Sequence, residues 1–207
     1  NKRFIMSIVT LNDRGVRSVT TFGSLNTGSM IFIKKLTASS SSDLSFVNGT
    51  SDVVLDSTYK EYVFTFKSIH PSANGPYFQV NFRDGGSSYD ATKTTTMFSA
   101  RHDEDGSNAL LAYKDSNDLA QGTGNQYLDG FGINNDNDSC ISGTLHLFNP
   151  SSTTFVKHFL VTTIGHSPAS NNFTAGYCNT TTAIDGVQFS FQSGNIDAGD
   201  ICLYGIL

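Results

Sequence analysis

The stretch "EYVFTFKSI", residues 61–69, decides the fold class because its side chains alternate in character. On an extended chain Tyr62, Phe64 and Phe66 fall on one side, while Val63, Thr65 and Lys67 fall on the other. A period of two residues is typical of a strand that has one buried face and one face in water.

The same alternation returns in "YFQVNFR" at residues 77–83 and in "GVQFSFQ" at residues 186–192. Further short strands are expected at residues 6–11, 30–38, 44–47, 92–101, 144–148, 155–164 and 200–206. Turn-forming clusters such as "PSANGP" and "RDGGSSYD" separate them. This pattern predicts an all-β protein, a jelly-roll-like antiparallel β-sandwich, in which only "ALLAYKDSNDLA", residues 109–120, suggests a short helix.

The serine run at residues 39–42 resembles a tether, but predicted strands lie directly on both sides of it. Because a true Gly/Ser tether is longer and lacks such neighbours, we expect a loop within one fold. The segment 12–28, which mixes charged residues with Thr, Ser and Gly, is a better connector. We therefore expect an N-terminal arm and connector at residues 1–28 and a β-sandwich domain at residues 29–207.

The arm is the most suggestive functional feature of the sequence. Its apolar run "RFIMSIVTL" predicts a strand that either pairs within its own domain or adds to the sheet edge of a neighbouring subunit. The candidate assembly residues are Phe4, Ile5, Ile8, Val9 and Leu11.

Charge and apolar content narrow the classes of partner. The net charge is −5 and no basic cluster exceeds two residues, so binding of nucleic acid through its phosphates is disfavoured. No apolar run approaches the roughly 20 residues that span a bilayer, so membrane insertion is not expected. The cysteines Cys140, Cys178 and Cys202 contain no CxxC pair, which argues against structural zinc, and a Cys140–Cys178 disulfide stays open.

No catalytic residue, cofactor or metal site is predicted. The acidic stretch "RHDEDG", residues 101–106, reads as a solvated turn, and "NNDNDS", residues 134–139, lacks the glycine that an EF-hand loop needs. The histidines fall in predicted strands (His146, His158) or turns (His70, His166), and no GxSxG motif is present. N-x-S/T sequons make four positions candidates for glycosylation: Asn48, Asn137, Asn172 and Asn179.

Four phrases of the sequence carry a resemblance: "GSMIFIKKLTASSSSDLSFV", "DSTYKEYVFTFKSIHP", "HLFNPSSTTFVKHF" and "SGNIDAGDICLYGI". They resemble small virion proteins of tailed phages that infect aquatic bacteria, proteins usually described as tail-fibre or unassigned structural proteins. The resemblance covers residues 6–207 and implies an assembly or recognition role in a multimeric particle or appendage. It implies no residue-level mechanism.

The expected function is therefore a non-enzymatic, multimeric structural subunit of a virion or appendage, of the tail-fibre or receptor-binding type. Its expected partners are copies of itself, other virion or appendage proteins and glycans of the host cell surface, and its expected location is the virion or the extracellular space. Two alternatives remain: a capsid-decorating protein or filament subunit joined by N-terminal strand addition, and, with less support, a secreted enzyme acting on polysaccharide.

Overall fold

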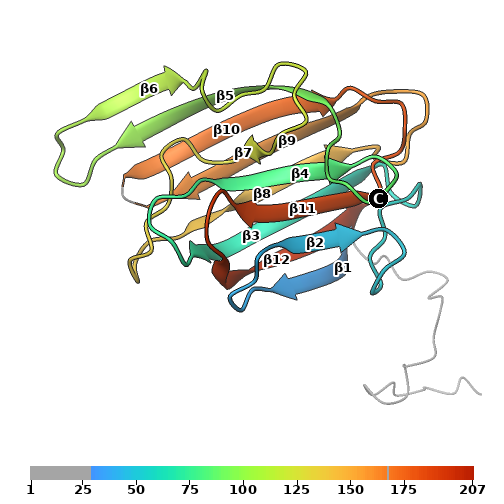
Figure 1. The fold of residues 1–207 in the computed structure, drawn as a ribbon, viewed down its shortest axis with the longest axis horizontal. Coiled ribbons are helices and arrows are strands. Elements are labelled where there is room, and N and C mark those ends of the chain that lie inside the picture. Colours follow the sequence, from blue (N-terminus) through green and yellow to red (C-terminus); the bar gives the residue numbers. More distant parts are fainter. Residues whose placement is uncertain (1–28, 167) are drawn as a thin grey trace, which may run out of the picture.

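The computed structural model describes residues 29–166 and 168–207, which form two antiparallel sheets packed as a sandwich (Figure 1). In spatial order, the eight-stranded sheet contains β1 (Met30–Thr37), β12 (Ile196–Ile206), β3 (Glu61–Pro71), β8 (Ile141–Phe148), β9 (Lys157–Gly165), β10 (Ala169–Cys178), β5 (Lys93–His102) and β6 (Ala109–Tyr113). The four-stranded sheet contains, in order, β2 (Leu44–Val47), β11 (Gly186–Phe191), β4 (Phe78–Arg83) and β7 (Gln126–Tyr127). The prediction of an all-β antiparallel sandwich is thus confirmed.

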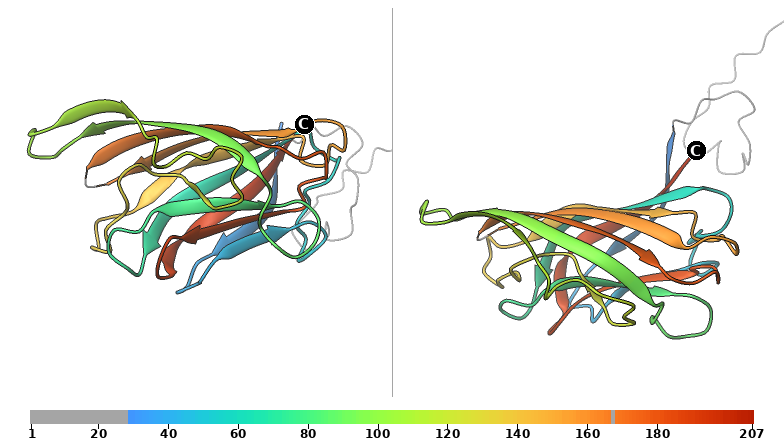
Figure 2. Two further views of the ribbon diagram at one scale, coloured as in Figure 1. Left: turned by 45° about the horizontal axis from the view of Figure 1, so that its top comes forward. Right: turned by 90° about the horizontal axis from the view of Figure 1, so that it is seen from above.

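Strand pairing is nested from the outside of the described chain inward. β1 pairs with β12, β2 with β11, β3 with β8 and β4 with β7, and successive pairs alternate between the two sheets. Two further hairpins, β9–β10 and β5–β6, widen the larger sheet on one side. We call β9, β10, β5 and β6 the extension; Figure 2 shows its β5–β6 hairpin projecting past the four-stranded sheet.

Aromatic rings fill the space between the two sheets. The Phe189 ring lies edge-on to Phe64 and Phe66, at centroid distances of 5.4 and 5.1 Å, and also contacts Phe46 and Phe78. Tyr62, Phe64 and Phe66 are no more than 2% exposed, so their predicted place on one buried side is confirmed. Val63 on the other side is also buried, at 4%, and the register of pairing with β8 shifts between Phe66 and Ile69. Burial of such large rings is the main favourable term in folding.

Three strands depart from the sequence expectations, and the shortest of them is β7, for which no strand was expected. Residues 109–113, expected at the start of a short helix, form β6, because they pair with β5 from Phe98↔Tyr113 to His102↔Ala109. β10 was not expected at all, since Asn and Gly are depleted in strands and "SPASNN" reads as a turn. His70, expected in a turn, lies near the end of β3.

Residues 38–43, which contain the serine run, connect β1 in the larger sheet to β2 in the smaller one. The interpretation of this run as a loop within the fold is confirmed. The predicted strand at residues 6–11 and the arm residues Phe4, Ile5, Ile8, Val9 and Leu11 lie outside the described residues. Within the described ranges, no helix has the length and apolar character needed to cross a membrane.

Candidate functional site

The inner side of the extension is buried and combines apolar side chains such as Phe159 and Val161 with a cluster of polar ones. In the middle of β10, Asn172 is 1% exposed, and its Oδ1 accepts hydrogen bonds from Ser99 Oγ at 2.7 Å and from the Gly130 amide at 3.0 Å. Its Nδ2 lies 3.3 Å from Thr163 Oγ1 on β9. These groups tolerate burial because each has a partner.

The connection at residues 128–133 covers this polar side and fits closely against it. A Cβ at Gly130 would lie 2.4 Å from Ser99 Oγ, and a Cβ at Gly132 would lie 2.3 Å from the Gly75 carbonyl oxygen. Only glycine allows so close an approach at these two positions. Residues 128–133 therefore cover the part of the larger sheet that the four-stranded sheet does not reach.

Asp129 fastens this connection to β4. Its Oδ2 accepts a hydrogen bond from the Phe78 amide at 2.6 Å, and its Oδ1 accepts from the amides of Gly132 at 2.6 Å and Phe131 at 3.2 Å. Burial raises the pKa of the Asp129 carboxyl to about 6, while the three amide donors act in the opposite direction.

The outer side of the extension is apolar and faces water. The outward positions are the even-numbered residues 158–164 in β9 and 94–102 in β5, and the odd-numbered residues 169–177 in β10 and 109–113 in β6. We call these side chains the extension face. None of them is Asp, Glu, Lys or Arg, and the large apolar members are Leu160, Ile164, Phe173, Tyr177, Phe98, Leu111 and Tyr113.

The extension face is uneven, because stacked aromatic rings stand beside small residues. Phe98 and Phe173 stack at 4.9 Å with an interplanar angle of 14°. Two shallow depressions, of about 250 and 280 Å³, share Thr96, Leu160 and Ala175, because Ala175 is small between larger neighbours. The surface therefore offers holes into which side chains of a partner can pack.

The area of the extension face is sufficient for a specific interface. Strands about 4.8 Å apart that rise about 3.3 Å per residue give four strands of about eight residues a projected area on the order of 500 Å². Two such faces together approach the roughly 1,000 Å² that a specific interface needs, before side-chain relief is counted. The largest apolar patch of a typical monomer is about 300–600 Å² and is often functional, so a surface of this size is a candidate interaction site.

The free edge of the extension is open. In β6, Leu110, Leu111 and Tyr113 are 49%, 72% and 55% exposed, and the strand contains no charged residue and no proline. At the opposite edge of the same sheet, β1 carries Lys34 and Lys35 and a register shift, features that prevent pairing with another chain. β6 has none of these protections (Figure 2).

The candidate glycosylation positions differ in accessibility. Asn48, Asn137 and Asn179 are exposed, although Asn48 Oδ1 accepts a hydrogen bond from the Leu55 amide and Asn179 Nδ2 donates one to Gln121. Asn172 is buried in the hydrogen-bonded cluster described above, so the folded chain does not offer it to a glycan and it leaves the candidate set.

The acidic stretch forms the turn of the β5–β6 hairpin. Arg101 donates two hydrogen bonds of 2.8 Å to Asp103, and Arg101 and then Asn108 lower the pKa of that carboxyl to about 2. Glu104 pairs with His166 at 2.9 Å instead of turning toward Asp103. In residues 29–166 and 168–207, no group of three His, Cys, Asp or Glu side chains is arranged to hold a metal ion.

All three cysteines are free, so the Cys140–Cys178 disulfide left open by the sequence is not formed. Burial raises the pKa of the Cys178 thiol to about 12, which keeps it protonated. Cys178 lies between Lys93 and Lys157, which are fully buried and which sequence reasoning missed, because lysine on a strand normally faces water. Both ammonium groups donate to backbone carbonyls, Lys93 to Ala91 and Lys157 to Thr180 and Thr182.

Comparisons of the chain with protein-family models, with curated proteins and with solved structures find no match.

The sequence pattern did not reveal the extension face, because β9 has large apolar residues on both sides, with Phe159 and Val161 inward and Leu160 and Ile164 outward. Only the spatial order of the strands shows which side lacks a cover.

Proposed function

We propose that this chain is a non-enzymatic structural subunit of a virion or extracellular appendage, and that copies of it associate through the extension face. The observation that carries the proposal is a largely apolar surface without Asp, Glu, Lys or Arg, outside a buried interior that includes the hydrogen-bonded Asn172 cluster. Removing the extension face from water stabilises association, and the acidic net charge does not oppose contact there because its carboxylates lie elsewhere.

The nested strand pairing supports a finer description of the fold as a jelly roll. The pairs β1–β12 and β3–β8 lie in one sheet, and the pairs β2–β11 and β4–β7, which come between them in the nesting, lie in the other. The extension is an addition to one sheet. Jelly rolls occur in viral capsids and in lectins, and fold analogy alone does not choose between such functions. The resemblance of four sequence phrases to tail-fibre-like virion proteins favours the first setting.

A second route to assembly is addition of a strand to the β6 edge, and the unprotected character of β6 favours it. The arm residues Phe4, Ile5, Ile8, Val9 and Leu11 of a neighbouring subunit would supply such a strand. Repeated head-to-tail addition would build a filament instead of a closed particle.

Light scattering coupled to gel filtration tests the proposal. The purified chain is expected to be oligomeric at micromolar concentration, and Leu160→Glu, at the centre of the extension face, is expected to shift it to the monomer. The matched control is Phe32→Glu, since Phe32 is 57% exposed on the outer face of β1, in the same sheet but outside the extension. A monomeric wild type, or an oligomer that survives Leu160→Glu, would contradict the proposal.

Removal of residues 1–11 separates the two routes. If the extension face alone drives association, the shortened chain keeps the mass of the wild-type oligomer. If the arm supplies a strand to β6, the shortened chain dissociates, and Leu110→Lys, which changes the β6 edge at a residue outside the extension face, has the same effect.

A further inference from the structure

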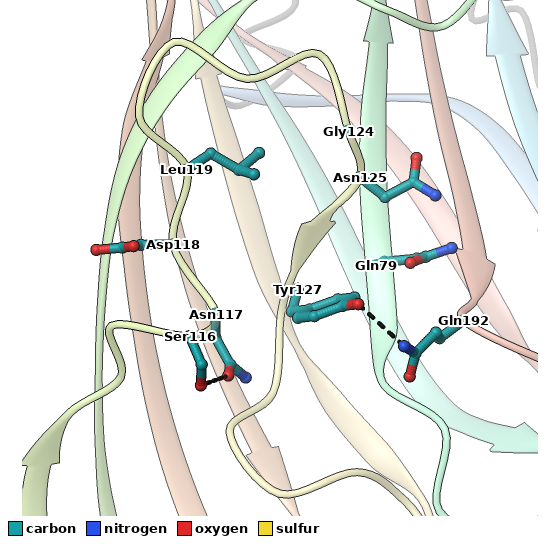
Figure 3. Close-up of a pocket in the computed structure, with 9 residues that line it drawn as sticks. All are labelled: Gln79, Ser116, Asn117, Asp118, Leu119, Gly124, Asn125, Tyr127 and Gln192. Carbon is teal, nitrogen blue, oxygen red and sulfur yellow. Dashed lines mark hydrogen bonds between the residues drawn. The ribbon is translucent and has the colours of Figure 1, made fainter.

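A polar pocket of about 420 Å³ lies on the side of the four-stranded sheet (Figure 3). It is formed by the outward residues of β4 and β7 together with residues 116–125, which connect β6 to β7. Its volume falls within the roughly 300–1,000 Å³ of small-molecule sites. The extension face belongs to the other sheet, and the two surfaces meet where the Tyr113 hydroxyl donates a hydrogen bond to Asp118.

The lining of the pocket is rich in amides that are already held in place by the protein. Gln79 donates through Nε2 to Ser190 Oγ at 2.9 Å and to the Phe191 carbonyl at 3.2 Å, which leaves its Oε1 for the pocket. Asn125 Oδ1 accepts from Asn81 Nδ2 at 2.9 Å, which leaves both hydrogens of its own amide. The pocket thus presents a fixed acceptor and a fixed donor, as a ligand with hydroxyl groups requires.

Asn117, on the side of the pocket opposite Gln79, is also held by hydrogen bonds to residues behind it. Asn117 donates through Nδ2 to the Asp129 carbonyl at 3.1 Å, and its own carbonyl accepts from Gln126 Nε2 at 2.8 Å. Because Asn117 and Gln126 are buried and bonded, the neighbouring lining residues need little rearrangement to bind a ligand.

One aromatic ring lines the pocket in a fixed orientation. Tyr127 stacks on Tyr77 at 4.6 Å with an interplanar angle of 19°, and Gln192 Nε2 donates to its hydroxyl at 3.1 Å (Figure 3). An aromatic surface beside amide donors and acceptors matches a pyranose ring, which has C–H groups on its faces and hydroxyls around its rim.

Charge excludes the other common ligand classes. Among the described residues, no Lys, Arg or His lines the pocket, and the Asp118 carboxylate points away from the other lining residues and accepts a hydrogen bond from the Tyr113 hydroxyl (Figure 3). A phosphate, sulfate or carboxylate ligand would therefore lack a cationic partner. A lipid chain would leave the amides without partners.

We propose that this pocket binds one neutral pyranose unit of a glycan, with Tyr127 as the platform and Gln79, Asn125 and Gln192 as its polar contacts. The proposal goes beyond self-association and does not depend on it. Leu160→Glu is expected to leave sugar binding unchanged, and a failure to bind sugar would leave the oligomeric state untouched.

Saturation-transfer NMR with the full chain tests the inference. The probes are the methyl α- and β-glycosides of glucose, galactose, mannose and N-acetylglucosamine, each titrated separately, with inorganic phosphate as an anionic probe. At least one glycoside is expected to bind in the millimolar range or tighter, and phosphate is expected not to compete with it.

Variants of Tyr127 and Gln192 place the binding in the pocket. Tyr127→Ala is expected to weaken the dissociation constant of the bound glycoside by about tenfold, because the platform is lost. Tyr127→Phe and Gln192→Ala are expected to weaken it by about two- to fivefold, because each removes one hydrogen bond. The matched control is Gln188→Ala on β11, whose amide bonds Ser45 outside the pocket and whose loss should leave the dissociation constant unchanged.

The inference is overturned if none of the eight glycosides binds, if phosphate displaces the bound one, or if Tyr127→Ala binds as tightly as the wild type. Circular dichroism and urea unfolding verify that each variant is folded. If Tyr127→Ala fails to fold, Tyr127→Phe and Gln192→Ala still decide, since unchanged affinity in both would also overturn the inference.

Discussion

The outer face of the eight-stranded sheet has two halves of opposite character. On β1, β12, β3 and β8, outward residues form polar pairs such as Lys35–Asp200 at 3.3 Å and Glu61–His146 at 2.6 Å, while the inward residues belong to the apolar core. On the extension, the outward residues include Leu160, Phe173 and Phe98, while Ser99 and Asn172 are buried inside. The outer face of one half of the sheet is therefore suited to contact with water, and the outer face of the other half is suited to contact with a protein partner.

This contrast also separates stability from association. The side chains that hold the sandwich together lie between the sheets, and those on the extension face contribute little until a partner covers them. Substitutions in the two places should therefore change different measured quantities, and the predictions below are ordered from the largest expected effect to the smallest.

Phe189→Ala should have the largest effect on stability, a loss of about 3–5 kcal/mol in the free energy of unfolding. The Phe189 ring is fully buried and contacts four other phenylalanine rings, so truncation leaves a cavity at the centre of the core. Urea unfolding measures the loss. Phe173→Ala, which removes an equal ring from the extension face, should cost less than about 1 kcal/mol in the monomer. Equal losses at the two positions would remove the contrast.

Asn172→Ala should cost about 2–4 kcal/mol, because Ser99 Oγ and the Gly130 amide lose the oxygen that accepts from them. The neighbouring residue supplies the control: Asn171 is on the exposed side of the same strand, and Asn171→Ala should change stability by less than about 0.5 kcal/mol. Thermal and urea unfolding of the two variants compare the two sides of β10 directly. A small effect at Asn172 would mean that the polar interior is incidental.

Stability should depend on pH through Asp129. Its pKa of about 6 in the folded chain exceeds the ordinary value of 3.8, so the folded state binds the proton more tightly than the unfolded chain does. The contribution of this group to the free energy of unfolding is therefore greatest below about pH 4 and is lost as the pH rises through 6, by on the order of 2–3 kcal/mol.

Urea unfolding gives the free energy of unfolding of the wild type and of Asp129→Asn at pH 4.5 and at pH 7. The contribution of Asp129 is the change between the two pH values in the wild type minus the same change in Asp129→Asn. Asp103 does not interfere, because its pKa of about 2 lies below the pH range used. Parallel pH dependence of the two proteins would show that the Asp129 carboxyl does not titrate there.

Leu111→Lys should have the smallest effect on stability, below about 0.5 kcal/mol, because Leu111 is 72% exposed on an edge strand. It should nevertheless reduce association, since Leu111 belongs to the extension face and a lysine on an edge strand also opposes strand addition. Gel filtration with light scattering detects this change. The control Thr37→Lys places the same charge on β1, where Lys34 and Lys35 are already present.

Strand alternation was sufficient to predict the sandwich where one side of a strand is apolar and the other polar, as in residues 61–69. It was insufficient for β6, where Ala and Leu favour a helix in isolation and pairing with β5 decides otherwise. It was also insufficient for β10, where Asn171, Asn172 and Gly176 are poor strand formers that are stabilised by two flanking strands.

The candidate surfaces were harder to predict than the fold, for a physical reason. The extension face consists of the strand sides that no other part of the described chain packs against. The sequence of a single strand does not show which of its sides that will be. The pocket combines Gln79, residues 116–127 and Gln192, which are far apart in the sequence and meet only after β4, β7 and β11 have paired. The arm residues proposed for assembly stay a prediction, since they lie outside the described residues.

The nested strand pairing has a consequence for the time course of folding. β9–β10 and β5–β6 are local hairpins that form after closing short loops, whereas β1 must find β12 across nearly the whole described chain. The two hairpins, including the open β6 edge, can thus form while the long-range pairs β10–β5 and β1–β12 are still incomplete. A newly made chain therefore exposes its proposed assembly surface early, and its yield should depend on how dilute or how well chaperoned it is during that interval.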